Sequence, residues 1–232
     1  MPTRSSAFWA GVRAELPLLV GVFPFGMIYG ILALDAGLPP AAAQAMSSIV
    51  FAGSSQFVAA QLFHAAAPAA VIVFTIAVVN LRHALYSASL APYTRRLSPL
   101  WKGLLAYLLT DEAYAVGINH FRGLNGSEPE EHAQGQWYFL GAGLALWSTW
   151  QLSTAAGVFL GAAVPANWPL DFTLPLTFIA LVMPGLKDRP AVAAALSAGL
   201  AALLVYSLPF KLGLILAALV GITVGMLLEK RP

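Results

Sequence analysis

The stretch AAAQAMSSIVFAGSSQFVAAQL, residues 41–62, decides how the rest of this chain is interpreted. It is long enough to cross a lipid bilayer, which takes about 20 mostly apolar residues. Its middle, however, combines a glycine with a group of polar side chains, namely Ser47, Ser48, Ser54, Ser55 and Gln56. Irregular backbone at bilayer depth is tolerated only where protein or a water-filled cavity covers it. We therefore expect a broken or re-entrant helix inside a larger membrane protein.

Charged residues are scarce in the whole chain. Lys and Arg number 12 and Asp and Glu number 10, so 9% of the 232 residues are charged, whereas 59% are hydrophobic. Soluble domains have about 25% charged residues and disordered chains combine high charge with low hydrophobicity, so both classes are excluded. The net charge of +2 is not gathered in a basic patch, which argues against nucleic-acid binding. The absence of cysteine excludes disulfides and thiolate metal sites. What remains is a polytopic protein of the lipid bilayer.

Eight long, charge-poor runs are candidate membrane segments. Their ranges are 16–36, 41–62, 67–92, 102–119, 137–164, 170–186, 190–207 and 210–228. The sixth run is short and contains Asp171, Pro175 and Pro184, so it also resembles a broken element. We expect an all-α polytopic integral membrane protein with six full spans and two broken or re-entrant helical segments. The alternative is seven or eight plain spanning helices.

The positions of the basic residues favour six full spans. If 41–62 and 170–186 enter and leave on one side, nine Lys and Arg lie in cytoplasmic segments, two lie outside, and Arg82 lies in the membrane. Both termini are then cytoplasmic, and the acidic loop 120–136 lies outside.

The same arrangement divides the chain into two similar halves. Residues 1–232 form a single transmembrane domain in which 1–119 and 137–232 each hold three spans and one broken segment. Because three is odd, the second half is upside down relative to the first. Inverted repeats with interrupted helices at matching places are typical of secondary transporters.

Ionisable side chains at bilayer depth are costly and commonly functional. Arg82 is such a residue, because the next cation, Arg95, follows more than two helical turns later. Its planar guanidinium matches a carboxylate through two hydrogen bonds, so it is a candidate to hold the carboxylate of a substrate. Tyr86 follows on the same helical stripe, and Asn80 and His83 lie on the adjoining face. The alternative for Arg82 is a side chain that extends to the headgroups or pairs with an acid.

Asp111 and Glu112 are adjacent carboxyls in the middle of an apolar run. Tyr107, Asp111 and Tyr114 have the spacing of one helix face. Both acids cannot stay ionised cheaply at this depth. One of them could pair with Arg82 while the other exchanges a proton, or one could accept a substrate ammonium. The alternative is a purely structural counter-ion for Arg82.

The sequence Gly53-Ser54-Ser55-Gln56 can unwind and expose backbone amides to a ligand. The N-terminus of the half-helix that follows would favour an anionic group. The alternative is helix packing, because small and hydroxyl side chains commonly join membrane helices.

The candidate residues fall into two groups. Those for substrate binding are Ser54, Ser55, Gln56, Asn80, Arg82, Tyr86, Asp111 and Glu112. Those for proton coupling are His83, Asp111 and Glu112, since a histidine titrates near neutral pH.

Two other classes of function compete with transport by alternating access. An intramembrane hydrolase could use Ser54 or Ser55 as nucleophile and His83 as base, but no G-x-S-x-G turn is present, and we expect no enzyme. A channel, or an exporter for another small organic solute, is the second rival. We expect no cofactor and no metal, because His and acidic residues do not cluster at ligand spacing.

Five motifs in order along the chain resemble the AzlC family of branched-chain amino-acid permeases. They are PFGMIYG (24–30), SSIVFAGSSQF (47–57), NLRHALYSASLAP (80–92), LLTDEAYA (108–115) and LDFTLPLTFIALVMP (170–184). The resemblance covers most of the chain up to residue 184, and the remainder carries no signature of the family.

The resemblance implies a multi-pass protein of the bacterial inner membrane that exports valine, leucine, isoleucine and methionine. It implies a secondary transporter driven by an ion gradient, and a small hydrophobic AzlD-type membrane subunit as its partner. No phosphate-binding GxxxxGK[ST] loop for ATP is present. A hydrophobic wall for an amino-acid side chain could come from aromatic residues, namely Phe23, Phe25, Tyr29, Phe51, Phe57 and Tyr86.

Overall fold

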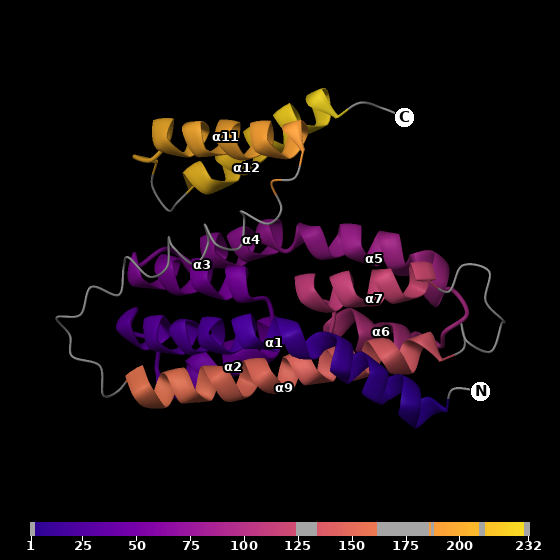
Figure 1. The fold of residues 1–232 in the computed structure, drawn as a ribbon. Helices are drawn as coiled ribbons and strands as arrows, with labels where there is room; N and C mark the ends of the chain where they lie inside the picture. The colour runs from indigo at the N-terminus through magenta and orange to yellow at the C-terminus, as the bar shows by residue number, and fades with distance from the viewer. Residues whose placement is uncertain (1–2, 124–133, 162–185, 187, 209–211, 230–232) are drawn as a thin grey trace. The chain divides into compact units, whose positions relative to one another are not determined.

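The computed structural model describes residues 3–123, 134–161, 186, 188–208 and 212–229 (Figure 1). The regular elements of these residues are all helices, so the expectation of an all-α fold is confirmed for the described part of the chain. The chain forms two compact units. Unit 1 consists of Met1–Ala60 and Val79–Val164, and unit 2 of Gln61–Val78 and Pro165–Pro232.

Unit 1 is built on two long helices, α1 (Arg4–Asp35) and α9 (Gly135–Gly161). A Cβ on Gly11 would lie 1.9 Å from the Tyr138 carbonyl oxygen, so the two backbones touch there. Further along, a Cβ on Gly30 would lie 2.5 Å from the Thr154 carbonyl oxygen.

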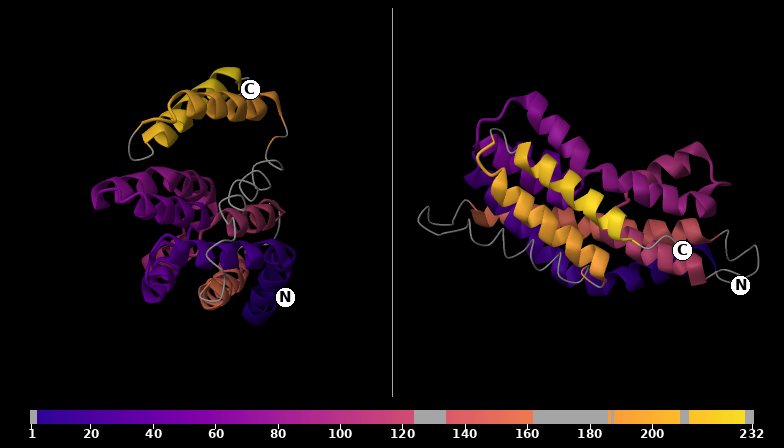
Figure 2. Two further views of the ribbon diagram at one scale, coloured as in Figure 1. Left: turned by 90° about the vertical axis from the view of Figure 1, so that its left-hand side faces the viewer. Right: turned by 90° about the horizontal axis from the view of Figure 1, so that it is seen from above.

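These contacts advance in the same direction along both helices. The two helices are therefore parallel, and they lie side by side in every view (Figures 1 and 2). We call the end at which both helices begin the Arg4 end and the opposite end the Asp35 end. Because the helices are parallel, the chain between them has to return to the Arg4 end.

The segment 41–62 is broken, as expected, into α2 (Pro40–Val50) and α3 (Gly53–His64). The break is at Phe51, whose φ of 40° is left-handed and cannot continue a helix. At about 1.5 Å per residue, each helix is roughly half as long as the bilayer core is thick.

The α2/α3 hairpin enters from the Asp35 end and turns back in the middle of unit 1. On the way in, the Tyr29 hydroxyl donates to the Ala43 carbonyl oxygen at 3.0 Å. At the turn, Gly53 lies beside the Phe25 ring. On the way out, Phe57 packs on Tyr29 again, with 5.8 Å between the ring centroids. The geometry of a re-entrant segment is therefore present here.

The segment 102–119 differs from our expectation of a full span. It contains two short helices, α6 (Pro99–Tyr107) and α7 (Asp111–Gly123). The tip between them lies level with the middle of α9, where the Trp147 Nε1 donates to the Tyr107 hydroxyl at 2.7 Å.

Both outer ends of this α6/α7 hairpin lie at the Arg4 end of unit 1. Trp101 in α6 meets Trp137 at the start of α9, with 4.8 Å between the ring centroids. Phe121 near the end of α7 lies against Gly135, where an added Cβ would be 2.4 Å from its ring. The hairpin therefore enters and leaves at one end, opposite to the α2/α3 hairpin.

The helix α5 (Leu81–Thr94) runs beside α7 toward the Arg4 end, where Tyr93 stacks on Phe121 at 5.1 Å between the ring centroids. The Lys102 ammonium donates to the Arg95 carbonyl oxygen at 3.1 Å. Arg122, which we expected on the opposite side from Arg4, lies at the same end as Arg4. The reason is the turn within the α6/α7 hairpin, which replaces a crossing.

Unit 2 contains α11 (Arg189–Leu204) and α12 (Leu212–Leu228), together with most of α4 (Ala69–Val79). The first two form an antiparallel pair, seen side by side in Figure 2. A Cβ on Gly213 would lie 2.6 Å from the Val205 carbonyl oxygen, and one on Gly221 would lie 2.8 Å from the Ala198 Cβ.

Two stretches of the described residues are long and apolar enough to cross a membrane, Arg4–Asp35 and Ala69–Thr94. The expected broken segment 170–186 lies, apart from Leu186, outside the described residues. The number of full spans and the inverted halves 1–119 and 137–232 stay predictions.

Candidate functional site

Three helices of unit 1 begin close to one another in its middle: α3 at Gly53, α5 at Leu81 and α7 at Asp111. The first backbone N–H groups of a helix have no partner within it, and they give that end a partial positive charge. The starts of α3 and α7 together make a favourable place for an anion.

Local sequence explains why two of these helices begin where they do. Thr110 precedes α7, and its hydroxyl accepts from the Ala113 amide at 3.3 Å, which is the geometry of an N-cap. Asn80 precedes α5 with φ −83° and ψ −2°, which interrupts the regular helix for one residue. Asp111 and Glu112 then occupy the first turn of α7, where negative charge is favourable.

Arg82 connects the tips of the two hairpins. Its Nη1 donates to the Asp111 Oδ2 in an ion pair, and its Nη2 donates to the Ser54 Oγ at 2.7 Å. The sequence left open which acid pairs with Arg82, and in the structure it is Asp111. The two side chains are 29% and 43% exposed, so both remain accessible to a small solute.

The neighbouring residues of α3 are fully buried and hydrogen-bonded. The Ser55 hydroxyl donates to the Asn80 Oδ1, and the Gln56 Oε1 accepts from the Trp150 Nε1 at 3.0 Å. The expected residues Ser54, Ser55, Asn80, Arg82 and Asp111 therefore form one cluster, with Gln56 behind it.

Several buried polar atoms of this cluster have no hydrogen-bond partner among the described residues. They are the Arg82 Nε, the Asp111 Oδ1, the Gln56 Nε2 and the His83 Nε2. Buried polar groups are normally paired, and an unpaired one calls for an explanation such as a missing ligand. Arg82 and Asp111 thus keep one free donor and one free acceptor beside their mutual ion pair.

Aromatic rings border the cluster on the α5/α7 side. Tyr86 stacks on Tyr114 with 4.4 Å between the ring centroids, and His83 meets the edge of Tyr86 at 5.9 Å. The Tyr114 hydroxyl also donates to the Ser89 Oγ at 3.0 Å. His83 and Tyr86 therefore lie next to the site, as expected.

A second aromatic group lies on the α1/α3 side. Phe25 packs on Phe57 at 4.6 Å and on Trp150 at 5.9 Å, and Tyr29 stacks on Trp150 at 6.2 Å. Phe23, which we expected in the hydrophobic wall, is instead 41% exposed.

The polar residues of segment 41–62 divide into two groups. Ser47 and Ser48 join α2 to α9, through the Thr154 hydroxyl at 2.9 Å and the Gln151 Oε1 at 2.8 Å respectively. Ser47 and Ser48 therefore join helices, which is the helix-packing alternative stated for this segment. Ser54 instead contacts Arg82, which agrees with the interpretation of residues 53–56 as part of a binding site.

The expected helix face of Tyr107, Asp111 and Tyr114 does not form, because the chain leaves the helix between the first two. Tyr107 instead secures the hairpin tips, and its hydroxyl donates to the Ser48 carbonyl oxygen at 2.6 Å. A continuous helix had been assumed where Thr110 starts a new one.

The hydrolase arrangement does not form among the described residues. The Ser54 hydroxyl accepts from Arg82, and the Ser55 hydroxyl donates to Asn80. Neither serine contacts His83, so no nucleophile–base pair is present there.

One buried acid was missed from the sequence. Glu15 is 0% exposed, and both of its carboxyl oxygens lack a hydrogen-bond partner among the described residues. It lies just before the expected segment 16–36, where the pattern predicts no membrane-embedded residue. The available signal was its place on one helix face with Gly11 and Val22.

Comparison with known proteins assigns the family. The family model for the AzlC protein matches residues 17–164, which include the whole cluster around Arg82. The chain belongs to the AzlC family.

Relatives of this AzlC-family chain come from bacteria and archaea. It is 28% identical over 231 residues to the inner membrane protein YgaZ of Escherichia coli, covering 96% of this chain and 89% of that protein. It is 31% identical over 224 residues to an uncharacterized membrane protein of Archaeoglobus fulgidus, covering 94% of each.

A further relative is named for its substrate. The chain is 27% identical over 183 residues to the branched-chain amino acid transport protein AzlC of Bacillus subtilis, covering 77% of this chain and 69% of that protein. No solved structure matches. The chain is therefore a membrane protein of a transport family, as its motifs indicated.

Proposed function

We propose that this protein is a secondary transporter that exports branched-chain amino acids across the inner membrane. The substrates are valine, leucine and isoleucine, with methionine as a further substrate, and export is coupled to a proton gradient. The observation that carries the proposal is Arg82, which joins two hairpin tips through Asp111 and Ser54, while its pair with Asp111 keeps a free donor and a free acceptor.

An amino acid is a zwitterion, and this pair offers a partner for each of its charges. The Arg82 guanidinium can bind the substrate carboxylate through its unpaired Nε together with an Nη. The Asp111 Oδ1 can accept from the substrate ammonium. The helix starts at Gly53 and Asp111 add donors and partial positive charge near the carboxylate.

The side chain of the substrate needs an apolar surface. The stacked Tyr86 and Tyr114 rings border the pair on one side, and Phe51 lies over Tyr107 near the hairpin tips at 5.9 Å. A branched aliphatic side chain gains by leaving water for such a surface, whereas a charged one does not.

The two opposed hairpins suit alternating access. Arg82 holds the α2/α3 tip through Ser54 and the α6/α7 tip through Asp111. A zwitterion that binds Arg82 and Asp111 competes with both of these contacts. Substrate binding would thereby release one tip from the other, and the tips could open in turn toward the Asp35 end and the Arg4 end.

Proton coupling would use acids and a histidine beside the site. His83 has an unpaired Nε2, and Glu112 follows Asp111 in the first turn of α7. Protonation of either side chain changes the charge next to the Arg82–Asp111 pair and so changes the affinity for the zwitterion.

The orientation and the partner complete the proposal. Basic residues of unit 1, among them Arg4, Arg95 and Lys102, lie at the Arg4 end, which the positive-inside rule assigns to the cytoplasm together with the N-terminus. A cytoplasmic C-terminus stays a prediction from the sequence. A small hydrophobic AzlD-type subunit is the proposed partner, by resemblance to the family.

Dipeptide feeding of cells tests the function. Cells with and without this chain and its small subunit are fed a valine-containing or a methionine-containing dipeptide, and the free intracellular amino acid is measured. Cells with the pair should accumulate less, and Arg82→Lys should remove this effect while Arg95→Lys, at the exposed end of α5, should not. Equal accumulation in all strains would contradict export of these substrates.

A further inference from the structure

Glu15 is a buried acid that the substrate site does not use. It lies in the twelfth position of α1, about 16 Å along the helix from Arg4. It is 0% exposed, and neither carboxyl oxygen has a hydrogen-bond partner among the described residues. An ionised carboxylate in such a place is very costly, so the neutral acid is the form that fits this conformation.

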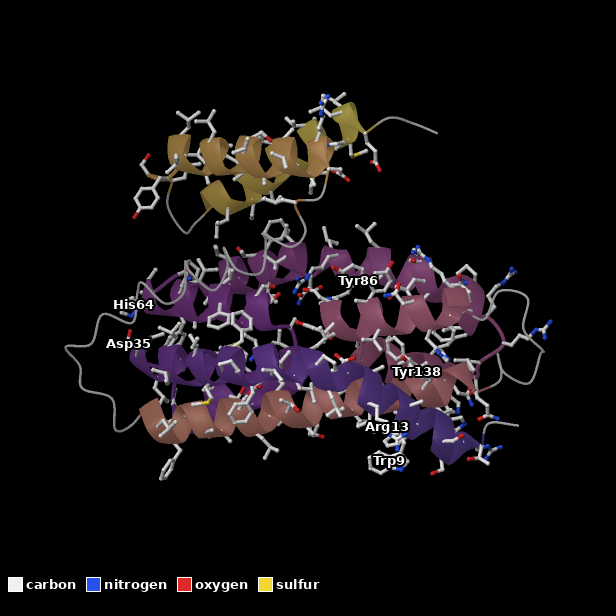
Figure 3. All side chains as sticks on the ribbon, viewed as in Figure 1. Trp9, Arg13, Asp35, His64, Tyr86 and Tyr138 are labelled. Carbon is white, nitrogen blue, oxygen red and sulfur yellow. The ribbon has the colours of Figure 1, made fainter. Side chains whose placement is uncertain are left out.

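Its own helix offers no compensating charge. Arg13 is two residues away and so projects from the other side of α1. Figure 3 shows Arg13 next to Trp9 on the outer side of the helix. Glu15 instead shares the face of Gly11, whose close approach to Tyr138 presses α1 against α9.

The titratable groups that face Glu15 come from α7 and α9, because α2, the third helix packed on α1, carries no titratable side chain. Glu112 of α7 is near enough to interact electrostatically with it. Tyr138 of α9, labelled in Figure 3, interacts with it in the same way. Glu15 therefore lies between the acid beside the substrate site and a phenol on the way to the Arg4 end.

A further titratable side chain, His120, lies toward the Arg4 end. Tyr138 stacks face to face on His120 of α7, with 3.7 Å between the ring centroids and 6° between the ring planes. His120 lies in the last turn of α7, close to where that helix ends. Glu112, Glu15, Tyr138 and His120 thus form a group of titratable side chains on three packed helices, and it extends from the first turn of α7 to its last turn.

We infer that Glu15 carries the coupling proton between Glu112, beside the substrate site, and water at the Arg4 end, and that Tyr138 and His120 position this route. The inference rests on the proposed function. In each transfer one O–H or N–H bond breaks and another forms, without any oxidation or reduction. Glu15 alternates between the neutral acid and the carboxylate, and one proton is taken from water or returned to it.

A proton suits this site better than a metal cation. A sodium ion takes several oxygen ligands, whereas Glu15 has only one other carboxyl, that of Glu112, near it among the described residues. The burial of Glu15 without any donor also favours the neutral acid, which carries its own proton.

The test uses the chain with its small subunit in proteoliposomes. Glu15→Gln imitates the neutral acid in shape and should leave valine exchange in the absence of a gradient, but remove the stimulation of valine flux by a pH gradient. Glu15→Asp should restore part of that stimulation. Asp35→Asn, which removes an exposed carboxyl from the other end of α1, is the matched control and should behave like the wild type.

The outcomes separate this inference from the proposed function. Stimulation by the pH gradient that is equal in wild type and Glu15→Gln would overturn the role of Glu15, and so would stimulation by a sodium gradient instead. A wild-type protein that does not exchange valine would contradict the proposed function. Glu15 is then still tested by infrared spectroscopy at neutral pH, where the intensity of the protonated-carboxyl band should be lower in Glu15→Gln than in the wild type and Asp35→Asn. An unchanged band in Glu15→Gln would refute the protonated state.

The route to the Arg4 end has its own variant. Tyr138→Phe keeps the ring, which stacks on His120, but removes the hydroxyl that the inference places along the route. Its response to the pH gradient should be slower than that of the wild type, while the infrared band of Glu15 persists. A response as fast as that of the wild type would remove Tyr138 from the route.

Discussion

The Arg82 guanidinium and the Asp111 carboxylate form an ion pair between the start of α5 and the start of α7. Through its second terminal nitrogen, Arg82 also holds Ser54 at the start of α3. One side chain thus connects the tips of two hairpins that enter unit 1 from opposite ends. This relationship links the fold to the proposed transport site.

Replacing Arg82 by lysine should impair transport although the charge remains. A single ammonium cannot reproduce the fork that reaches Asp111 and Ser54 and presents Nε to a substrate. Loss of one charge-assisted hydrogen bond costs about 1.5–3 kcal/mol, which corresponds to a roughly 10- to 100-fold loss. We expect this loss in the affinity for valine, measured as the concentration for half-maximal exchange. Arg95→Lys is the control, and equal effects at both positions would contradict a specific role for Arg82.

A double variant should show how much the Arg82–Asp111 ion pair contributes to the free energy of unfolding. Asp111→Asn leaves the Arg82 charge uncompensated and should lower the free energy of unfolding by about 1–3 kcal/mol. Arg82→Gln combined with Asp111→Asn removes both charges and should recover most of this loss. Thermal unfolding in detergent measures the effect.

Transport distinguishes a binding pair from a structural pair. The double variant should be folded and yet fail to exchange valine, because neither charge of the zwitterion has a partner. A stable double variant with wild-type exchange would show that the pair is only structural.

The α6/α7 hairpin predicts the side of the membrane on which labels react. The chain has no cysteine, so single cysteines can be introduced without removing others. Arg96→Cys and Gly123→Cys flank the hairpin and should react with a membrane-impermeant thiol reagent from the same side, because both lie at the Arg4 end. Asp35→Cys should react from the other side. If positions 96 and 123 react from opposite sides, residues 102–119 cross the membrane, and the hairpin is contradicted.

Two glycines of α1 should differ sharply when replaced by alanine. In Gly11→Ala the new Cβ would lie 1.9 Å from the Tyr138 carbonyl oxygen, so α1 and α9 have to move apart. Overpacking of this kind costs about 1–3 kcal/mol. Gly21 has nothing within 4 Å of an added Cβ, and Gly21→Ala should be neutral or stabilising by up to about 1 kcal/mol. Melting temperatures of the two variants measure the difference, and a similar loss in both would contradict the parallel α1/α9 packing.

Much of the site could be predicted from the sequence because charges are so rare in it. Arg82 and Asp111 stood out in apolar runs, and the glycine and serines of 47–56 indicated a broken helix. The sequence alone could not show whether Arg82 pairs with Asp111 or with Glu112. That assignment depends on the turn of α7, which directs Asp111 toward α5.

Other features were not predicted, because a run of apolar residues does not show where a helix within it is interrupted. Residues 103–109 of the run 102–119 carry no charge and are mostly apolar, so the pattern predicts a full span. Thr110 followed by two acids is, however, a pattern typical of a helix start. Glu15 was missed for a related reason, since an acid at the edge of an apolar run is normally taken as solvent-exposed.

Valine counterflow in proteoliposomes tests the central claim most directly. Vesicles that contain the chain and its small subunit are loaded with unlabelled valine, and the entry of labelled valine is followed without any ion gradient. A transporter with its site at Arg82 and Asp111 should give transient, saturable accumulation of label that Arg82→Lys weakens and Arg95→Lys leaves intact. Entry that does not saturate, or that is the same with Arg82→Lys as with the wild type, would contradict it.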